Sequence, residues 1–120
     1  MVLRQEARES LLTEKEASFL CRGGLGRLAT ASPDGQPHIV PVVYEFDGRF
    51  LYFSGRNLAS SLKWRHMLSS RKVAFVVDDV VSVSPWRARG VEVRGVAELL
   101  HERGRPYVRI TPVTKASWGL

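Results

Sequence analysis

Small and basic residues gather in the connection between two apolar segments of the chain. Ser54, Gly55 and Arg56 follow an aromatic segment, Lys63 and Arg65 come later in the same connection, and this connection holds no acidic residue. Backbone N–H groups at a helix start, small side chains and fixed cations together suit an anion such as a phosphate group. We therefore interpret the connection as an anion-binding site. A solvated basic helix is the alternative interpretation of the same charges.

The positive charge of the chain is concentrated around this connection. The formal net charge is +6, and residues 54–95 carry eight basic and three acidic side chains. A localised positive field favours a polyanionic partner, which is either a phosphorylated small molecule or a nucleic acid. A small basic barrel that binds nucleic acid would need aromatic stacking platforms, for which the candidates are Phe50, Tyr52, Trp64 and Trp86.

Length and composition limit the other possibilities. We expect the 120 residues to form one domain, residues 1–120, in which residues 1–12 are an N-terminal lead-in. No apolar run approaches the roughly 20 residues that cross a bilayer, and the charged start lacks the apolar centre of a signal peptide. We therefore expect no membrane partner and a cytoplasmic location.

Residues that commonly bind metals or act as nucleophiles do not form recognisable sets. The single cysteine, Cys21, excludes an internal disulfide, and we expect it to be a small buried residue. His38, His66 and His101 have no metal-like spacing, so we expect no metal site. If the chain is an enzyme, a bound cofactor should therefore supply its chemistry.

Hydrophobic periodicity indicates the elements that position these residues. Thr13 and Glu16 fit a capping box at the start of one short amphipathic helix, which the glycine cluster at 23–26 ends. The strands are predicted at 27–31, 38–46, 49–53, 73–78, 90–100 and 107–118. We predict a mainly β fold, a six-stranded antiparallel barrel with one or two short helices, whose pocket is shaped by loops at 79–89 and 101–106.

Pro41 lies inside the second predicted strand, where it cannot donate a hydrogen bond to a neighbouring strand. A proline within a strand indicates a sheet edge or a bulge. A flat ligand could pair with the backbone groups that such a gap leaves free. A plain edge proline is an equally favoured interpretation.

Three segments resemble the pyridoxamine-5′-phosphate-oxidase-like split β-barrels, which bind FMN or the deazaflavin F420: 26–30, 34–42 and 76–79. Two more segments, 85–95 and 109–120, are similar to the branch of that family that holds F420-dependent reductases, including reductases of dehydrotetracycline-type intermediates. The resemblance covers residues 15–120 and implies the split β-barrel fold.

The resemblance also implies how the cofactor phosphate is held. Lys63 and Arg65 match the basic positions that anchor the phosphate in the family, and Ser54, Gly55 and Arg56 are further candidates. Two positions depart from the family pattern: His66, where asparagine is usual, and Arg71, where proline is usual.

The remaining implied roles concern the cofactor ring and the subunit interface. Val40, Pro41 and Val42 match the strand whose backbone lies along the ring, in agreement with the argument from Pro41. Three positions match residues that close the pocket from the partner subunit: Trp86, Arg87 and Trp118. The resemblance thus implies a homodimer with cofactor sites at the subunit interface.

The function implied by the resemblance is that of an F420-dependent oxidoreductase. It would transfer a hydride from the reduced deazaflavin to an activated double bond or similar acceptor of a small-molecule substrate. The surplus of Arg56, Arg87 and Arg89 would suit the polyglutamate tail of F420, which FMN lacks, so F420 is favoured. The first alternative is an FMN-binding protein of the same fold, either an oxidase or reductase or a non-catalytic flavin binder. The nucleic-acid-binding barrel is the second.

Overall fold

The computed structural model describes residues 11–120, so residues 1–10 of the expected lead-in lie outside the described part of the chain. Helix α2 (Glu14–Leu20) comes first, and the 3₁₀ turn η1 (Leu58–Ser60) and helix α3 (Leu62–Ser69) connect the third and fourth strands. The strands are β1 (Gly24–Ala31), β2 (Pro37–Phe46), β3 (Leu51–Phe53), β4 (Lys72–Ser82), β5 (Arg87–Glu102) and β6 (Arg105–Trp118). No helix among the described residues has the length and apolar character needed to cross a membrane.

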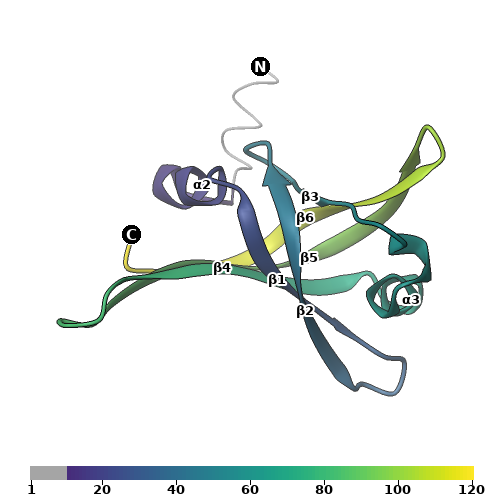
Figure 1. Cartoon of the computed structure of the whole chain (residues 1–120), viewed down its shortest axis with the longest axis horizontal. Helices are drawn as coiled ribbons and strands as arrows, with labels where there is room; N and C mark the ends of the chain where they lie inside the picture. Colours follow the sequence, from purple (N-terminus) through teal and green to yellow (C-terminus); the bar gives the residue numbers. More distant parts are fainter. Residues whose placement is uncertain (1–10) are drawn as a thin grey trace.

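The six strands are antiparallel and close into a barrel in the order β1-β2-β3-β6-β5-β4 (Figure 1). The predicted fold, a six-stranded antiparallel barrel with one or two short helices, is confirmed. Buried and outward-facing side chains alternate along β5: Val91, Val93 and Ala97 are buried, whereas Glu92 and Arg94 are on the outer face. Removal of these alternate apolar side chains from water is the main force that closes the barrel.

The packing of Phe75 shows how the barrel interior is joined to α2. A Cβ atom at Gly26 would lie 2.3 Å from the Phe75 ring, so β1 needs a glycine at this point. The Phe75 ring packs edge-to-face on Tyr44, with the ring centroids 5.2 Å apart. The Tyr44 hydroxyl donates a hydrogen bond to the Leu20 carbonyl at 2.8 Å, at the end of α2.

Glu16 fastens the other end of α2. The predicted capping box is present: the Thr13 hydroxyl accepts a hydrogen bond from the Glu16 N–H at 3.1 Å, and Glu16 Oε1 accepts one from the Thr13 N–H at 2.8 Å. Glu16 is also buried, and it accepts hydrogen bonds from Lys115 Nζ at 2.7 Å and from the Ser117 hydroxyl. One carboxylate therefore caps α2 and ties it to the end of β6.

The segment 79–89 was expected to be a loop, and this expectation is wrong. β4 continues to Ser82 and β5 begins at Arg87, so the two strands form a long arm that projects to one side of the barrel (Figure 1). Backbone pairing continues as far as Ser82 opposite Arg87. Within this ladder Asp79 and Arg89 lie directly opposite each other and form a bidentate ion pair across the arm. Asp78, the last residue of the predicted strand 73–78, lies inside β4 on the opposite face.

The expected loop at 101–106 is also mostly strand. β5 and β6 stay paired as far as Glu102 and Arg105, so the turn consists of Arg103 and Gly104 alone. Both turn residues have positive φ, of 53° and 76°, as the tightest two-residue hairpins require.

Two smaller expectations are also corrected. β3 begins at Leu51 rather than at residue 49, because the Asp47 carboxylate accepts hydrogen bonds from the N–H groups of Arg49 and Phe50 at 2.9 and 2.8 Å and holds them in the turn. Cys21 is exposed rather than buried, because it is the C-cap residue of α2, where the chain turns toward β1.

Glu16 makes the stability of the fold depend on pH. Burial alone would raise the pKa of Glu16, but the hydrogen bonds from Lys115, Ser117 and Thr13 outweigh this effect and lower the pKa from 4.5 to about 2. A carboxyl group with a depressed pKa in the folded state stabilises the protein above its unfolded pKa, and the stabilisation is lost as pH falls through the folded pKa. We expect about 2–3 kcal/mol of unfolding free energy to disappear in this way, between about pH 4.5 and about pH 2.

Urea unfolding of the wild type and of Glu16→Gln over this pH range measures the effect. The difference in unfolding free energy should be largest at neutral pH and should shrink toward pH 2. Glu14→Gln, which removes an exposed carboxylate of the same helical turn, is the matched control and should show little change with pH. A difference between wild type and Glu16→Gln that stays constant with pH would refute the assignment.

Candidate functional site

The predicted anion-binding connection places Lys63 at the start of a helix. The Ser61 hydroxyl caps α3 by accepting a hydrogen bond from the Trp64 N–H at 3.3 Å. Lys63 is the second residue of α3 and is half-buried, and the first turn of the helix has no acidic residue. Because a helix N-terminus already carries partial positive charge, a lysine there is unfavourable until an anion neutralises both. The start of α3 is therefore well suited to a phosphate group.

Lys63 and Arg65 do not share a face of α3, although the resemblance assigns both to the phosphate. Residues two apart on a helix point to different sides, and Arg65 is exposed. Arg71, one of the two departures from the family pattern, is exposed beyond the end of α3, and its carbonyl accepts a hydrogen bond from the Ala97 N–H at 2.7 Å. Of these cations, Lys63 is the one that lies at the helix start.

His66, the other departure from the family pattern, points into the barrel. Its Nδ1 lies 2.9 Å from the hydroxyl of Thr30 on β1, and both residues are buried. The ring of His38 on β2 lies edge-to-face on His66, with the centroids 5.6 Å apart. The Nδ1 atom of His38 is buried and has no hydrogen-bond partner among residues 11–120. His66 therefore fixes α3 against the barrel instead of extending the cationic surface of the helix.

The segment of β2 that holds Val40, Pro41 and Val42 has one unpaired edge. β1 pairs with β2 from Pro37 to Tyr44, with Pro41 opposite Arg27, but β3 pairs only with the last three residues of β2. Within the described part of the chain, no strand covers the other edge of β2 before Tyr44. This is the gap expected from Pro41, and its backbone groups can pair with a flat polar ligand.

Ser54, Gly55 and Arg56 leave β3 and line one side of a hollow of about 800 Å³. The other side is the β5–β6 hairpin, which contributes Glu102, Arg103, Arg105, Pro106 and Tyr107. Sequence reasoning treated this hairpin as a pocket-shaping loop and missed its arginines. The sequence did contain a signal for these arginines: a basic residue stands on each side of Gly104, between two strands with alternating apolar residues.

Trp86, Arg87 and Trp118 lie at the other end of the molecule. Trp86 is in the turn of the β4–β5 arm and is 66% exposed, and Arg87 begins β5. Trp118 ends β6 opposite Gly90, where a Cβ atom would lie 2.4 Å from the Trp118 ring. The arm and the end of β6 are at one end of the long axis and α3 is at the opposite end (Figure 1). These residues are therefore not brought together with Lys63 within one chain.

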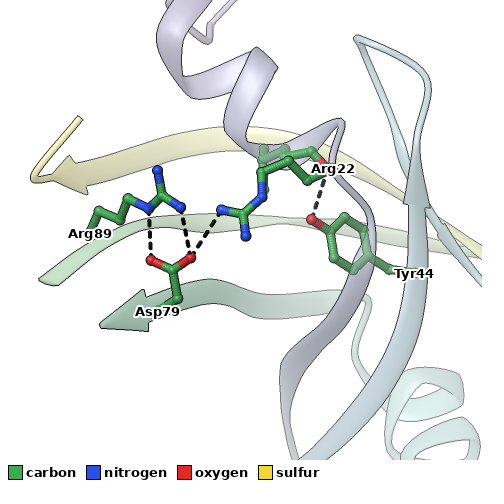
Figure 2. A network of polar contacts seen from close by, with 5 residues as sticks. Arg22, Tyr44, Asp79 and Arg89 are labelled. Atoms are coloured by element: carbon green, nitrogen blue, oxygen red, sulfur yellow. Dashed lines mark hydrogen bonds and ion pairs between the residues drawn. The ribbon is translucent and has the colours of Figure 1, made fainter. Parts of the chain in front are cut away.

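The guanidinium group of Arg89 is paired with a carboxylate of the same chain. Its guanidinium donates two hydrogen bonds to Asp79, at 2.7 and 3.0 Å, and Arg22 lies 3.1 Å from the same carboxylate (Figure 2). The hydrogen bonds from Arg89 are the main reason that the pKa of Asp79 is lowered. Both guanidinium groups also lie over the ring of Phe19, at 5.2 and 4.7 Å. This packing argues against the expected role of Arg89 in holding a cofactor tail.

The aromatic side chains considered as stacking platforms for nucleic acid are mostly engaged within the chain. Trp64 is only 7% exposed, and it packs edge-to-face on a histidine ring. Phe50 and Tyr52 are half-buried and lie edge-to-face, 6.3 Å apart. Trp86 is the exposed member of the four. One exposed ring does not form the series of platforms on which successive bases stack.

Comparison with known proteins places these features in a family. The family profile of pyridoxamine 5′-phosphate oxidase matches residues 12–115, which is most of the chain. The chain belongs to the pyridoxamine 5′-phosphate oxidase family. The resemblance deduced from the sequence motifs is thereby confirmed, and the barrel with its partly unpaired β2 edge is this chain's version of the family fold.

Several members of the family can be compared in detail. A 5a,11a-dehydrotetracycline/5a,11a-dehydrooxytetracycline reductase of Streptomyces rimosus subsp. rimosus is 38% identical and covers 90% of this chain and 83% of its own length. A conserved hypothetical protein of Mycobacterium tuberculosis superposes with a TM-score of 0.76 at 26% identity, over 93% of this chain and 88% of its own. An F420 reductase superposes with a TM-score of 0.71 at 25% identity, over 88% of this chain and 98% of its own.

The contact between Thr30 and His66 can be tested as a structural feature of this family member. Thr30→Val keeps the shape of the side chain but removes the hydroxyl, so the buried Nδ1 of His66 loses its partner. An unsatisfied buried polar group costs about 1–3 kcal/mol, and we expect Thr30→Val to lower the unfolding free energy by that amount in a urea titration.

Thr30→Ser is the matched control, because it keeps the hydroxyl and loses only a methyl group. We expect it to retain more stability than Thr30→Val. Equal losses in the two variants would show that the hydrogen bond to His66 contributes nothing.

Proposed function

We propose that the chain is an F420-dependent reductase, which acts on an activated double bond of a small-molecule substrate. The observation that carries the proposal is the 38% identity, over 90% of the chain, with a reductase of dehydrotetracycline-type compounds. The F420 reductase that shares the fold at 25% identity supports the choice of cofactor.

The residues of this chain fit a cofactor that has a flat ring and a phosphate group. Lys63 and the start of α3 would hold the phosphate, because the first helical turn has a lysine and no acidic side chain. The backbone of Val40, Pro41 and Val42 would pair with polar groups of the ring, since no strand of the described chain covers that edge. When bound, the reduced deazaflavin supplies the hydride.

The chain's own part is to position the reactants and to exclude water. Tyr44 is unsuited to serve as a proton donor, because its hydroxyl donates to the Leu20 carbonyl at 2.8 Å within the core. Burial also raises the pKa of Tyr44 to about 12. In this proposal the proton that completes the reduction comes from solvent rather than from Tyr44.

Cofactor binding tests this proposal directly. We expect the purified protein to bind F420 more tightly than FMN, and Lys63→Ala to weaken F420 binding at least about tenfold, which corresponds to about 1.4 kcal/mol, since a charge-assisted hydrogen bond contributes about 1.5–3 kcal/mol. Titration followed by the fluorescence of each cofactor measures the affinities.

Lys15→Ala removes an equal charge from the exposed face of α2 and is the control, for which we expect unchanged affinity. Equal affinity of the wild type and Lys63→Ala for F420 would refute the assignment of Lys63 to the cofactor phosphate. Tighter binding of FMN would favour the flavin-binding alternative. If the protein binds neither cofactor but binds nucleic acid with an affinity that falls steeply with salt, the nucleic-acid alternative would be favoured.

We further propose that the protein is a homodimer with the cofactor sites at the subunit interface. The outer face of the barrel carries exposed apolar side chains: Ile39 and Val43 on β2 are 65% and 69% exposed, and Leu25 on β1 lies opposite Val43. Contiguous apolar surface of this kind marks an interaction site. A second copy of the chain is the occupant that we favour, because Trp86 and Trp118 lie far from α3 and can close a site only on another copy.

The oligomeric state tests this second proposal. We expect sedimentation velocity to give twice the 13.5 kDa mass of the chain, and Ile39→Glu/Val43→Glu to give a monomer, because two carboxylates would be buried without partners in the interface. We expect F420 affinity to fall together with dimerisation.

Val96→Glu places a carboxylate at an exposed apolar residue of β5, outside the proposed contacts, and is the control, which should remain dimeric. A wild type that sediments as a monomer yet binds F420 tightly would contradict the shared site.

A further inference from the structure

A pocket of about 390 Å³ lies between α2, the base of the β4–β5 arm and the residues after β6. Phe19 of α2, Arg22 of the turn after α2 and Arg89 of β5 line it, and Leu120 is on the same lining. We call it the α2 pocket. It shares no residue with the start of α3 or with the hollow beside the β5–β6 hairpin, so it is a separate feature of the molecule.

Two guanidinium groups of the α2 pocket converge on one carboxylate (Figure 2). Asp79 accepts hydrogen bonds from Nε and Nη2 of Arg89 at 2.7 and 3.0 Å, and Nη1 of Arg22 lies 3.1 Å from the same carboxylate. The guanidinium groups also lie over the ring of Phe19, 4.7 Å from its centroid for Arg22 and 5.2 Å for Arg89. The hydrogen bonds from Arg89 lower the pKa of Asp79, so the carboxylate stays charged. Both guanidinium groups are therefore held in place before any ligand binds.

The contacts to Asp79 do not use all the hydrogen-bond donors of these arginines. A guanidinium group has about five N–H donors, and two hydrogen bonds join Arg89 to the carboxylate. The side chains of Arg22 and Arg89 are 50% and 37% exposed, so a ligand can reach their other N–H groups. Glu14 and Lys15 also line the pocket and add one charge of each sign. The α2 pocket thus offers two cationic donor groups that suit a flat ligand with an anionic oxygen.

The arm does not need Arg22 to hold its strands together. The bidentate pair of Asp79 and Arg89 already links β4 to β5, and an ion pair as exposed as that of Arg22 contributes little to stability. Arg22 also brings a second positive charge beside that of Arg89, and the two charges repel each other. A negatively charged atom of a ligand would relieve this repulsion, which gives the second guanidinium group a function.

The α2 pocket lies at the end of the molecule that carries the β4–β5 arm (Figure 1). Arg89 comes shortly after Trp86 of the arm turn, and Leu120 comes shortly after Trp118 at the end of β6. In the proposed homodimer this end closes over the cofactor ring of the other copy. The pocket then borders that ring, and the second copy keeps water out of it. Exclusion of water strengthens hydrogen bonds to a developing charge.

We propose that the α2 pocket binds the carbonyl group of the substrate, an α,β-unsaturated ketone, and that Arg22 and Arg89 stabilise the negative charge that the reduction places on the carbonyl oxygen. The inference rests on the proposed function and on the proposed homodimer. Donors that are fixed where the charge develops lower the barrier of such a reaction.

The chemistry of the step is that of a conjugate reduction. The hydride forms a new C–H bond at the β-carbon, the electron pair of the C=C bond moves to the bond beside the carbonyl carbon, and the carbonyl oxygen becomes an enolate. A proton from solvent then adds to the α-carbon. The substrate gains a hydride and a proton, and the deazaflavin is oxidised by the loss of the hydride.

Binding of a stable enolate tests the assignment of the pocket. Dimedone is a cyclic diketone that is an enolate anion at neutral pH, and dimethylcyclohexanone is the neutral ketone with the same ring. NMR titration of the wild type, with and without oxidised F420, measures both affinities. We expect dimedone to bind at least about tenfold more tightly than the neutral ketone, because charge-assisted hydrogen bonds are the stronger ones. We also expect it to shift the amide signals of Phe19 and Arg22.

A variant of Arg22 separates the pocket from the arm. Arg22→Gln removes the charge but leaves the pair of Asp79 and Arg89 intact. We expect it to lose at least about tenfold in affinity for dimedone and less than about twofold for the neutral ketone. Arg22→Lys keeps the charge without the planar fork and should recover part of the loss.

Arg109→Gln is the matched control. Arg109 also pairs with a carboxylate and lies over a phenylalanine ring, but it lies outside the α2 pocket. It should bind dimedone with the affinity of the wild type. Thermal unfolding of each variant measures how far the fold is retained.

Reduction of cyclohexenone by reduced F420 gives a second measurement. We expect Arg22→Gln to lower kcat at least about tenfold and to change KM less than about threefold, because the contact strengthens only as the charge develops. An equal loss of kcat in Arg109→Gln would contradict the assignment.

The outcomes distinguish this inference from the proposed function. If dimedone binds no more tightly than the neutral ketone, or equally well to the wild type and Arg22→Gln, the assignment of the pocket is wrong, while tight binding of F420 leaves the proposed function standing. If the protein binds F420 but does not reduce cyclohexenone, the substrate class is wrong. If dimedone binds through Arg22 but F420 does not bind, the proposed function fails, and the role of the pocket in the reduction fails with it.

Discussion

The unpaired edge of β2 is the constraint around which the rest of the structure is arranged. Backbone N–H and C=O groups need partners, and an exposed strand edge invites unwanted pairing. β3 covers only the last three residues of β2. Pro41 removes one donor from the uncovered segment, which makes that edge less able to recruit another strand. After β3 the chain does not continue along β2 but turns into η1 and α3. Because the chain turns away from β2 after β3, the edge of β2 stays open. The same turn leads into α3 and places Lys63 at the start of that helix.

The arrangement of charge divides the cations into two classes. Those on the barrel wall, such as Arg89 and Arg109, lie against carboxylates and hold neighbouring strands together. Those at α3 and at the β5–β6 hairpin have no such partners among the described residues. The paired cations and carboxylates on the barrel wall neutralise each other locally. The excess that gives the net charge of +6 is therefore carried by the unpaired cations. Three exposed arginines line one hollow where the connection after β3 meets the hairpin: Arg56, Arg103 and Arg105. Cations gathered in this way attract anionic ligands.

The sequence predicted the fold better than it predicted the details of its elements. Alternation identified the six strands, and the spacing of Thr13 and Glu16 identified the helix start, because both depend on residues close together in the chain. The second role of Glu16 depends on Lys115, about a hundred residues away, and no local pattern records it. The arm at 79–89 was missed for the same reason, since the ion pair between Asp79 and Arg89 becomes visible only in the register of the two strands. The inward direction of His66 likewise follows from how α3 packs on β1.

The distance between the two ends of the barrel gives the proposed dimer a physical rationale. The cations of α3 lie at one end of the long axis, and the aromatic side chains of the β4–β5 arm and the end of β6 lie at the other. A flat cofactor needs both, a charged anchor for its phosphate and an apolar cover for its ring. One chain cannot fold back on itself to supply them, because the closed barrel fixes the two ends apart. In a twofold pairing, each chain would present its aromatic end to the cationic end of the other, and the two contacts would be equivalent by symmetry. The apolar outer face around Ile39 and Val43 then has a reason to stay uncovered within a single chain.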